Sequence, residues 1–225
     1  MQPQSEIGIN YHLVRLPPED PRYPKSLKYG KSRPSHSTIM SIGNLDILKT
    51  ESLAMFCSQK CPGQLILQTY DLARSLREAG ITIIGGFHSP MEKECLSLLL
   101  RGHQPVIICP ARSIQGMRLP PEWKSALAEG RLLLLSTFKE HCRRPTTALA
   151  QVRSEVVATI ANAIFVAHAA AGGKTERFCQ ELLAQNKPLF TLEGDHNAHL
   201  IELGARPIHP DNIGGCWHNN FPFLP

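Results

Sequence analysis

Six short apolar runs, separated by longer amphipathic segments, constrain the fold of this chain more than any other feature. Each run is four to six residues long and does not alternate with polar residues; the runs span 53–57, 81–85, 105–109, 132–135, 164–167 and 188–192. Runs of this kind are typical of strands that are buried on both faces of a sheet. They therefore predict a sheet that lies between two layers of helices.

The segments between these runs have the length and periodicity of helices. They predict helices over 63–79, 90–101, 120–129, 146–161 and 174–185. Strands that alternate with helices of this length are joined by right-handed crossovers and pair in parallel. The sequence thus predicts an α/β protein with a Rossmann-like three-layer fold and a mostly parallel sheet of about six strands.

The length of 225 residues suits one fair-sized domain better than two. Residues 1–40 contain six prolines and no sustained periodicity, so we expect an irregular N-terminal extension there. The Rossmann-like domain is expected over 41–210. Residues 211–225 form a short C-terminal tail, whose aromatic residues favour docking on the body or on a partner.

Composition indicates a protein of the cytoplasm. The seven cysteines are odd in number and lie mostly in apolar runs, which favours reduced, buried thiols. No basic-then-apolar leader and no run of about 20 apolar residues is present, so we expect no membrane association. The formal charge of +5 is a mild excess, and only its placement can indicate a partner.

The residues that follow the apolar runs carry most of the candidate chemistry, because ligands of such sheets bind beyond the carboxyl ends of the strands. Cations outnumber acids in these segments, which predicts an anionic ligand. In chain order the candidates are Ser58, Gln59, Lys60, Gly86, Phe87, His88, Ser89, Arg112, Arg118, His141, Arg143, Arg144, His168, Gly172, Gly173, Lys174 and Thr175. The acids are chiefly Glu92, Glu140 and Glu176.

Two expected helix starts, at 89–92 and 172–175, have free backbone N–H groups that suit a phosphate. A second interpretation stays open for each: Ser89 and Glu92 also fit a cap of their own helix, and the glycine pair also fits a simple turn. Residues 168–175 approach a phosphate-binding Walker A loop, but His168 replaces its first glycine. An ATPase is therefore not favoured.

Metal and aromatic features are weak. Cys57 and Cys61 have no second cysteine pair, and His196 and His199 lack the accompanying glutamate of a zinc motif, so we predict no metal site. Phe87 and Phe138 are the aromatic residues at the ligand edge. Each fits either the core or a base-stacking surface.

Four short motifs, taken in order, point to a known family. Tyr23-Pro24-x-x-Leu27 is followed by Gly43-Asn44-Leu45-Asp46-Ile47-Leu48, by Ile84-Gly85-Gly86-Phe87-His88-Ser89, and by Asn197-Ala-His-Leu200-Ile201-Glu-Leu-Gly204-Ala205. In order and spacing they resemble the DprA/Smf family of DNA-processing proteins. The Rossmann-like domain of that family belongs to the same wider group as the LOG phosphoribohydrolases.

The chain departs from that family at four segments. One of them is Ser89-Pro90-Met91-Glu92, which stands where the family has Gly-Ile-Asp and Ala-His. Cys57-Ser58-Gln59-Lys60 stands where the family has Gly-Ser-Arg, and Val152-Arg153-Ser154-Glu155 stands where it has Arg-Asn-Arg. Gly172-Gly173-Lys174-Thr175 replaces a Ser-Gly-Ser-Leu loop. The chain is therefore similar to a divergent branch.

The resemblance implies a non-catalytic protein without a cofactor that binds single-stranded DNA at the basic strand ends. It also implies a homodimer and a RecA-type recombinase as partner during DNA uptake and recombination. The DNA- or phosphate-binding set is then Ser58, Lys60, Gly85, Gly86, His88, Ser89, Arg112, Arg143, Arg144, Arg153, Gly172, Gly173, Lys174 and Thr175.

Two alternatives remain open. A LOG-like nucleotide-binding protein or nucleoside-monophosphate phosphoribohydrolase is suggested by Gly172-Gly173-Lys174-Thr175-Glu176, which resembles the glycine-rich loop of those enzymes. N-glycosidic cleavage needs a working carboxylate, for which Glu92 or Glu176 is the candidate. The other alternative is an interaction protein whose basic edge binds an acidic partner.

Overall fold

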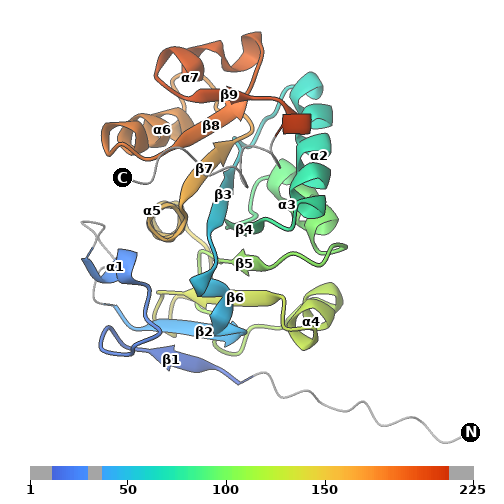
Figure 1. Cartoon of the computed structure of the whole chain (residues 1–225). Helices are drawn as coiled ribbons and strands as arrows, with labels where there is room; N and C mark the ends of the chain where they lie inside the picture. The colour runs from blue at the N-terminus through green and yellow to red at the C-terminus, as the bar shows by residue number, and fades with distance from the viewer. Residues whose placement is uncertain (1–11, 30–36, 213–225) are drawn as a thin grey trace, which may run out of the picture.

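A single nine-stranded sheet forms the centre of the molecule (Figure 1). The computed structural model describes residues 12–29 and 37–212. The strand order is β1-β2-β6-β5-β4-β3-β7-β8-β9. The strands are β1 (Val14–Leu16), β2 (Ile39–Gly43), β3 (Ser52–Phe56), β4 (Thr82–Gly85), β5 (Val106–Ile108), β6 (Leu132–Ser136), β7 (Ala163–Val166), β8 (Leu189–Leu192) and β9 (Arg206–Ile208).

All six predicted strands are present as β3 to β8, and they pair in parallel together with β9. Strand β3 shows why these runs are apolar throughout. Leu53 and Met55 belong to one hydrophobic core, whereas Ala54 and Phe56 belong to the other. Because successive side chains of a strand point to opposite faces, both faces need apolar residues. The α/β Rossmann-like class is confirmed.

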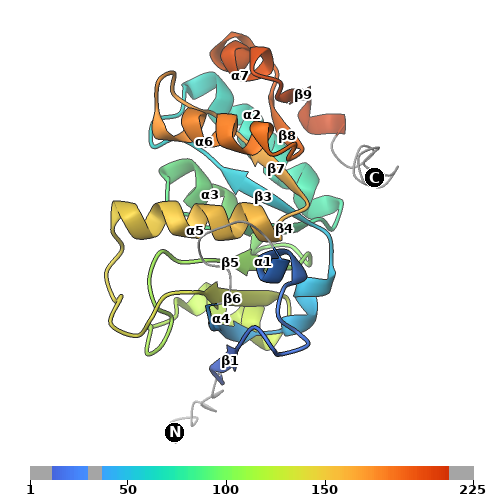
Figure 2. The ribbon, with the colours of Figure 1, turned by 90° about the vertical axis from the view of Figure 1, so that its left-hand side faces the viewer.

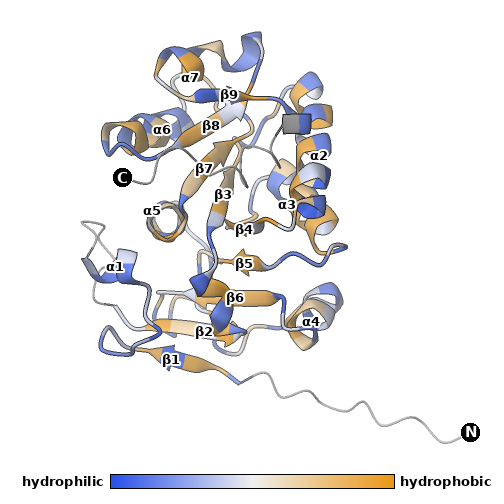
Figure 3. Cartoon of the chain, viewed as in Figure 1, coloured by the Kyte–Doolittle hydropathy of each residue, from blue (hydrophilic) through white to orange (hydrophobic). Residues whose placement is uncertain are grey.

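Helices cover both faces of the sheet (Figures 1 and 2). One layer holds α2 (Gly63–Glu78), α3 (Pro90–Leu99) and α4 (Pro121–Ala128), and the other holds α1 (Lys25–Tyr29), α5 (Thr147–Ile160) and α6 (Lys174–Ala184). Helix α7 (Ala198–Glu202) and the 3-10 turns η1 (Leu45–Lys49), η2 (Asp195–Asn197) and η3 (Pro210–Asn212) complete the fold. Figure 3 shows the apolar strands between these layers. In the described ranges, no helix has the length and apolar character needed to cross a bilayer.

The sheet has nine strands rather than about six. The additional strands, β1, β2 and β9, lie at or next to its edges. Strands β1 and β2 pair antiparallel, and β2 also pairs antiparallel with β6. The first forty residues therefore contribute β1, α1 and the start of β2 where an irregular extension was expected. Of the expected C-terminal tail, residues 213–225 lie outside the described residues.

The order of the strands creates a switch point at β3. The chain proceeds from β3 through β4 and β5 to β6 on one side, and then returns to place β7, β8 and β9 on the other side. Connections that leave in opposite directions open a crevice beyond the carboxyl ends of the strands at this point. The fold thus directs the search for a site to the residues after β3 and its two neighbours.

Candidate functional site

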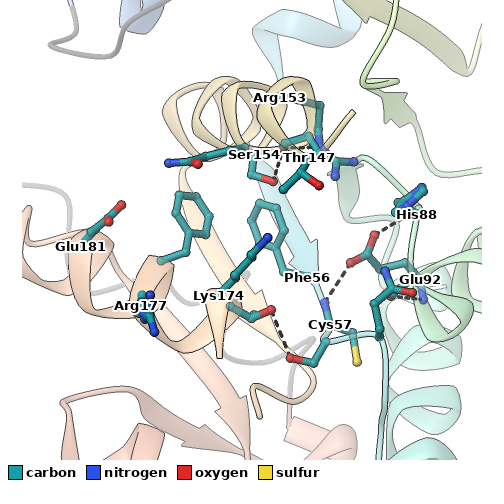
Figure 4. Close-up of a pocket in the computed structure, with 17 residues that line it drawn as sticks. Phe56, Cys57, His88, Glu92, Thr147, Arg153, Ser154, Lys174, Arg177 and Glu181 are labelled. Atoms are coloured by element: carbon teal, nitrogen blue, oxygen red, sulfur yellow. Dashed lines mark hydrogen bonds between the residues drawn. The ribbon is translucent and has the colours of Figure 1, made fainter. Parts of the chain in front are cut away.

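A cavity of about 490 Å³ opens at this switch point (Figure 4). Its walls come from the ends of β3 and β4 and from α3, α5 and α6. The lining residues are Phe56, Cys57, Ser58, Gln59, His88, Ser89, Glu92, Thr147, Ala150, Gln151, Arg153, Ser154, Lys174, Thr175, Arg177, Phe178 and Glu181. Of the predicted site residues, the cavity brings together Ser58, His88, Ser89, Arg153, Lys174 and Thr175.

Arg153 lies in the wall of the cavity and is only 7% exposed. Its guanidinium rests where a side chain on residue 86 would be: a Cβ added to Gly86 would lie 0.8 Å from Nη1 of Arg153. Burial lowers the pKa of Arg153, and the nearby Glu92 carboxylate opposes this shift. Gly86, a predicted ligand contact, thus serves to accommodate the arginine.

Glu92 ties two strand ends together beneath the cavity. Glu92 is 5% exposed, and its carboxylate accepts hydrogen bonds from the backbone N–H of Cys57 at 2.9 Å and of His88 at 2.8 Å. The Glu92 N–H donates to Ser89 Oγ at 3.3 Å, which confirms Ser89 as the cap of α3. The carboxylate therefore joins the loop after β3 to the loop after β4, in addition to helping begin its own helix.

The glycine-rich loop before α6 is closed upon itself. The Gly172 N–H donates to Glu176 Oε2 at 2.7 Å, and the Gly173 N–H donates to the Ala170 carbonyl at 2.9 Å. Contrary to the expectation from the sequence, these two amides are not free for a phosphate, and neither glycine lines the cavity.

Ser58 fixes this loop to the end of β3. Its hydroxyl donates to Thr175 Oγ1 at 3.1 Å and accepts from the Ala170 N–H at 3.0 Å. Lys174 and Thr175 line the cavity at the start of α6, and Figure 4 shows the Lys174 side chain there.

An aromatic wall was missed by the sequence analysis. The rings of Phe56 and Phe178 meet edge to face with centroids 5.5 Å apart, and both line the cavity. Phe178 lies four residues after Lys174, so the two share one face of α6. That spacing is the signal that could have found it. Phe87 and Phe138, the aromatic residues considered from sequence, are buried instead.

The remaining predicted residues lie outside the cavity. Gly85 ends β4, and a Cβ there would meet the Phe87 ring at 3.1 Å, so it is a packing position. Lys60, Arg143 and Arg144 are exposed, and Arg112 is half-buried. Arg112, Arg143 and Arg144 belong to two loops, 110–118 and 137–146. These loops follow β5 and β6, so they lie at the carboxyl ends of the parallel strands, as the cavity does.

Hydrogen bonds hold these two basic loops together. The Ser113 N–H donates to the Cys142 carbonyl at 2.8 Å, and Ser136 Oγ donates to the Arg112 carbonyl at 2.8 Å. The two loops that carry the arginines are thus joined to each other, beyond the carboxyl ends of β5 and β6. Over the part of the chain that is described, no group of three or more His, Cys, Asp and Glu side chains is arranged to hold a metal ion.

A family model for DNA recombination-mediator protein A matches residues 15–212, which include the whole cavity. The chain belongs to this family. The match begins within β1 and ends within η3, so the family accounts for the edge strands as well as for the parallel core.

Solved structures support the fold of this family member. DprA from Streptococcus pneumoniae has 18% identity and a TM-score of 0.74, covering 91% of this chain and 73% of that chain. DNA processing protein A from Helicobacter pylori has 18% identity and a TM-score of 0.75, covering 94% and 98%. The molybdenum cofactor carrier protein of Chlamydomonas reinhardtii is more distant, with 10% identity and a TM-score of 0.52 over 76% of this chain and 98% of that one. A comparison with curated proteins finds no match.

The LOG-like alternative is not favoured for this chain. Both oxygens of Glu92 already accept backbone N–H groups. Glu176 accepts from Gly172, lies 3.6 Å from His199 Nε2, and is absent from the cavity wall. Neither acid is placed as a free base above a ligand.

Gly86→Ala tests whether the position of the Arg153 guanidinium matters to a ligand. The new methyl group occupies the place of Nη1 and displaces a flexible side-chain end rather than backbone. We expect binding of a single-stranded oligonucleotide to weaken roughly tenfold, about the value of one charged hydrogen bond. Fluorescence anisotropy measures the change. Gly63→Ala is the matched control, because nothing lies within 4 Å of a Cβ there; equal affinities for the two variants would contradict the role of Gly86.

Proposed function

We propose that this protein binds single-stranded DNA in the cavity at the switch point, as part of DNA processing for recombination. One observation carries the proposal: an almost fully buried arginine forms the wall of an open cavity and is held against Gly86. Support comes from the H. pylori relative, whose structure is described as giving insight into a unique single-stranded DNA binding mode.

The charges around the cavity suit an anion. Burying a guanidinium is costly unless a partner compensates its charge. Glu92 supplies one negative charge nearby, while Lys174 and Arg177 add two cations to the wall and Glu181 adds one acid. With Arg153, the cavity wall therefore has three cations against two acids, and its net charge is positive. A planar guanidinium with a fixed orientation suits two-point recognition of a phosphate or of a base edge.

The aromatic wall suits a base. Phe178 is only half-buried, and it lines the cavity one helical turn after Lys174 on α6. An aromatic side chain next to cations is the usual combination in proteins that bind single strands, because every base has a face that can stack. A cavity of about 490 Å³ admits a nucleotide-sized group. It therefore favours an unpaired strand over a duplex.

The basic loops extend the proposed path of the strand. Strands β4, β5 and β6 follow β3 in order across the sheet, so the loop after β6 lies about 15 Å from the end of β3 at the usual strand spacing. A single strand that crosses this edge contacts the cavity first and then Arg112, Arg143 and Arg144. These three predicted residues keep a role as flanking phosphate contacts in the proposal.

A salt series with a labelled single-stranded oligonucleotide tests the proposal. Three to five phosphate contacts give a slope of log K against log salt of roughly −2 to −3.5. We expect Lys174→Ala to make this slope shallower by about 0.7, the value for one phosphate on a single strand. Lys49→Ala is the control, because Lys49 is exposed at the opposite edge of the sheet, just before β3.

Competitors separate the proposed ligand from its alternatives. Unlabelled single strand should displace the label, whereas duplex of the same sequence should compete poorly. Displacement by a nucleoside monophosphate at similar concentration would move the assignment to a small-nucleotide ligand. An absence of binding at low salt would contradict the proposal altogether.

The wider proposal follows the family resemblance. We infer a cytoplasmic homodimer that acts with a RecA-type recombinase in natural transformation. Light scattering of the purified protein tests the dimer, and co-precipitation with a RecA-type recombinase in the presence of nuclease tests the partner. A protein that is monomeric at micromolar concentration would contradict the proposed homodimer. A recombinase that no longer co-precipitates after nuclease treatment would contradict the proposed partner.

A further inference from the structure

A second cavity, the amino-edge cavity, opens at the amino ends of the strands. Its volume is about 610 Å³, and its walls come from the turn between α2 and β4 and from the loop between α3 and β5. The lining residues are Arg77, Glu78, Gly80, Arg101, Gly102, His103, Gln104 and Pro105. Gly80 precedes β4 and Gly86 follows it, so roughly 20 Å separates this cavity from the switch point. One small ligand therefore cannot occupy both sites.

Basic side chains outnumber acids in the amino-edge cavity. Nη2 of the half-buried Arg77 lies 3.5 Å from Oε1 of the exposed Glu78, which is a loose contact. Arg101 is exposed, and no ion pair joins it to another described residue. His103 adds a ring that becomes cationic in acid. Among the described residues that line the cavity, Glu78 is the one acid, so the wall favours an anion.

A buried amide lies beside the Arg77 side chain. Gln104 is 2% exposed, and its Nε2 donates to the Leu99 carbonyl at 2.8 Å, which fixes the orientation of the amide. Oε1 of Gln104 is buried and has no hydrogen-bond partner among the described residues. A Cβ added to Gly102 would lie 2.1 Å from this oxygen and 2.3 Å from Cγ of Arg77. The negative end of the amide dipole thus lies close to the Arg77 stem and favours a cation there.

Another guanidinium supports the loop between α3 and β5. Arg131 directly precedes β6, and its Nη2 donates to the Leu100 carbonyl at 2.8 Å, next to Arg101. Its Nε donates to Glu129, whereas its Nη1 is buried and has no hydrogen-bond partner among the described residues. The backbone that carries Arg101 is therefore fixed by a cation, which adds to the positive potential at the cavity.

We propose that the amino-edge cavity is a second anion site, which binds a phosphate group through the guanidinium groups of Arg77 and Arg101. A guanidinium presents paired N–H donors that match two phosphate oxygens. Free phosphate and the backbone of a nucleic acid present the same oxygens, so the experiment has one arm for each. The proposal does not rest on the proposed function, because the two sites lie at opposite ends of β4.

NMR spectroscopy of the 15N-labelled full chain tests the site, because each cavity has a glycine amide of its own. Gly102 reports on the amino-edge cavity and Gly86 on the switch point. Inorganic phosphate is titrated, with chloride at equal ionic strength as the control. We expect a saturable shift of the Gly102 amide with a dissociation constant of about 1 mM, the range for two or three charged hydrogen bonds. A shift that does not saturate, or that chloride reproduces, would overturn the proposal.

Arginine variants test the residues that hold the phosphate. Arg77→Gln and Arg101→Gln should each weaken phosphate binding at Gly102 roughly 10- to 100-fold. Arg74→Gln is the matched control, because Arg74 lies one turn earlier on α2 and pairs with the exposed Asp71; its affinity should stay within about twofold. Since Arg101 is exposed, its variant remains informative even if Arg77→Gln does not fold. Equal phosphate affinities for Arg101→Gln and Arg74→Gln would overturn the assignment.

The Arg153→Gln variant distinguishes the two sources of phosphate. This substitution impairs the cavity at the switch point, so a single-stranded oligonucleotide that still shifts Gly102 identifies the backbone of a nucleic acid as the ligand. A shift with inorganic phosphate but not with the oligonucleotide identifies a free phosphate. In the wild-type protein, an oligonucleotide that leaves Gly86 unshifted would contradict the proposed function, while the phosphate titration still decides on the amino-edge cavity.

Discussion

Arg153→Gln will weaken binding of a single-stranded oligonucleotide by roughly 30-fold to 5,000-fold, the range for truncating one partner of a buried charged contact. Two effects act in the same direction. The ligand loses a guanidinium that the protein already holds in place against Gly86. The Glu92 carboxylate, which lies near that guanidinium, also loses its compensating charge and repels an anion.

Anisotropy titrations at one fixed low salt concentration measure this effect. Arg74→Gln is the matched control, because Arg74 is an exposed arginine on α2 whose partner is the exposed Asp71. Urea unfolding of both variants establishes that the loss is one of binding and not of folding. If Arg153→Gln and Arg74→Gln bind within threefold of each other, the buried arginine is not the centre of the site.

Glu92→Ala will lower the free energy of unfolding by about 2–5 kcal/mol, because it removes a buried group on which several others depend. The N–H groups of Cys57 and His88 lose their acceptor, and Arg153 loses the nearby opposite charge. Urea unfolding monitored by circular dichroism measures the change.

The same helix provides the control for this effect. Glu94→Ala removes an exposed glutamate two residues further along α3 and should change the free energy of unfolding by less than about 0.5 kcal/mol. Glu92→Gln keeps one acceptor oxygen and should fall between the two alanine variants. A stability of Glu92→Ala equal to that of Glu94→Ala would show that the two strand ends do not depend on the carboxylate.

The parallel core could be predicted from the sequence because its signals are local. The residues of β3 to β8 are apolar on both faces, and Ser89 with Pro90 specifies the start of α3 within two residues. The edge strands carry no such signal. Strands β1 and β9 have three residues each, and only Leu16 and Ile208 of these are buried. These segments are strands because they pair with a neighbouring strand. Three residues are too few to predict from the sequence which strand that neighbour is.

The candidate site was predictable where it follows strand ends and not where it lies inside helices. Ser58, His88 and Lys174 come directly after strands or at a helix start, whereas Phe178 lies in the second turn of α6. Arg153 lies in the middle of α5 and was indicated only through the family resemblance. The hydrogen bond from Gly172 to Glu176 depends on the side-chain conformation of Glu176. The spacing of residues in the sequence does not determine that conformation.

The position of β2 in the sheet has a consequence for the order in which the protein is completed. Strand β2 precedes the entire parallel core in the chain, yet Gly43 pairs with Leu133, about 90 residues later. At ribosomal rates of about 5–20 residues per second, β2 waits roughly 5–20 s for its partner to be synthesised. During that interval β2 can pair with β1, but the edge of β6 that it joins in the finished sheet does not yet exist. Strand β2 is therefore made before the core strands but takes its place in the sheet after them, when it closes the edge of β6.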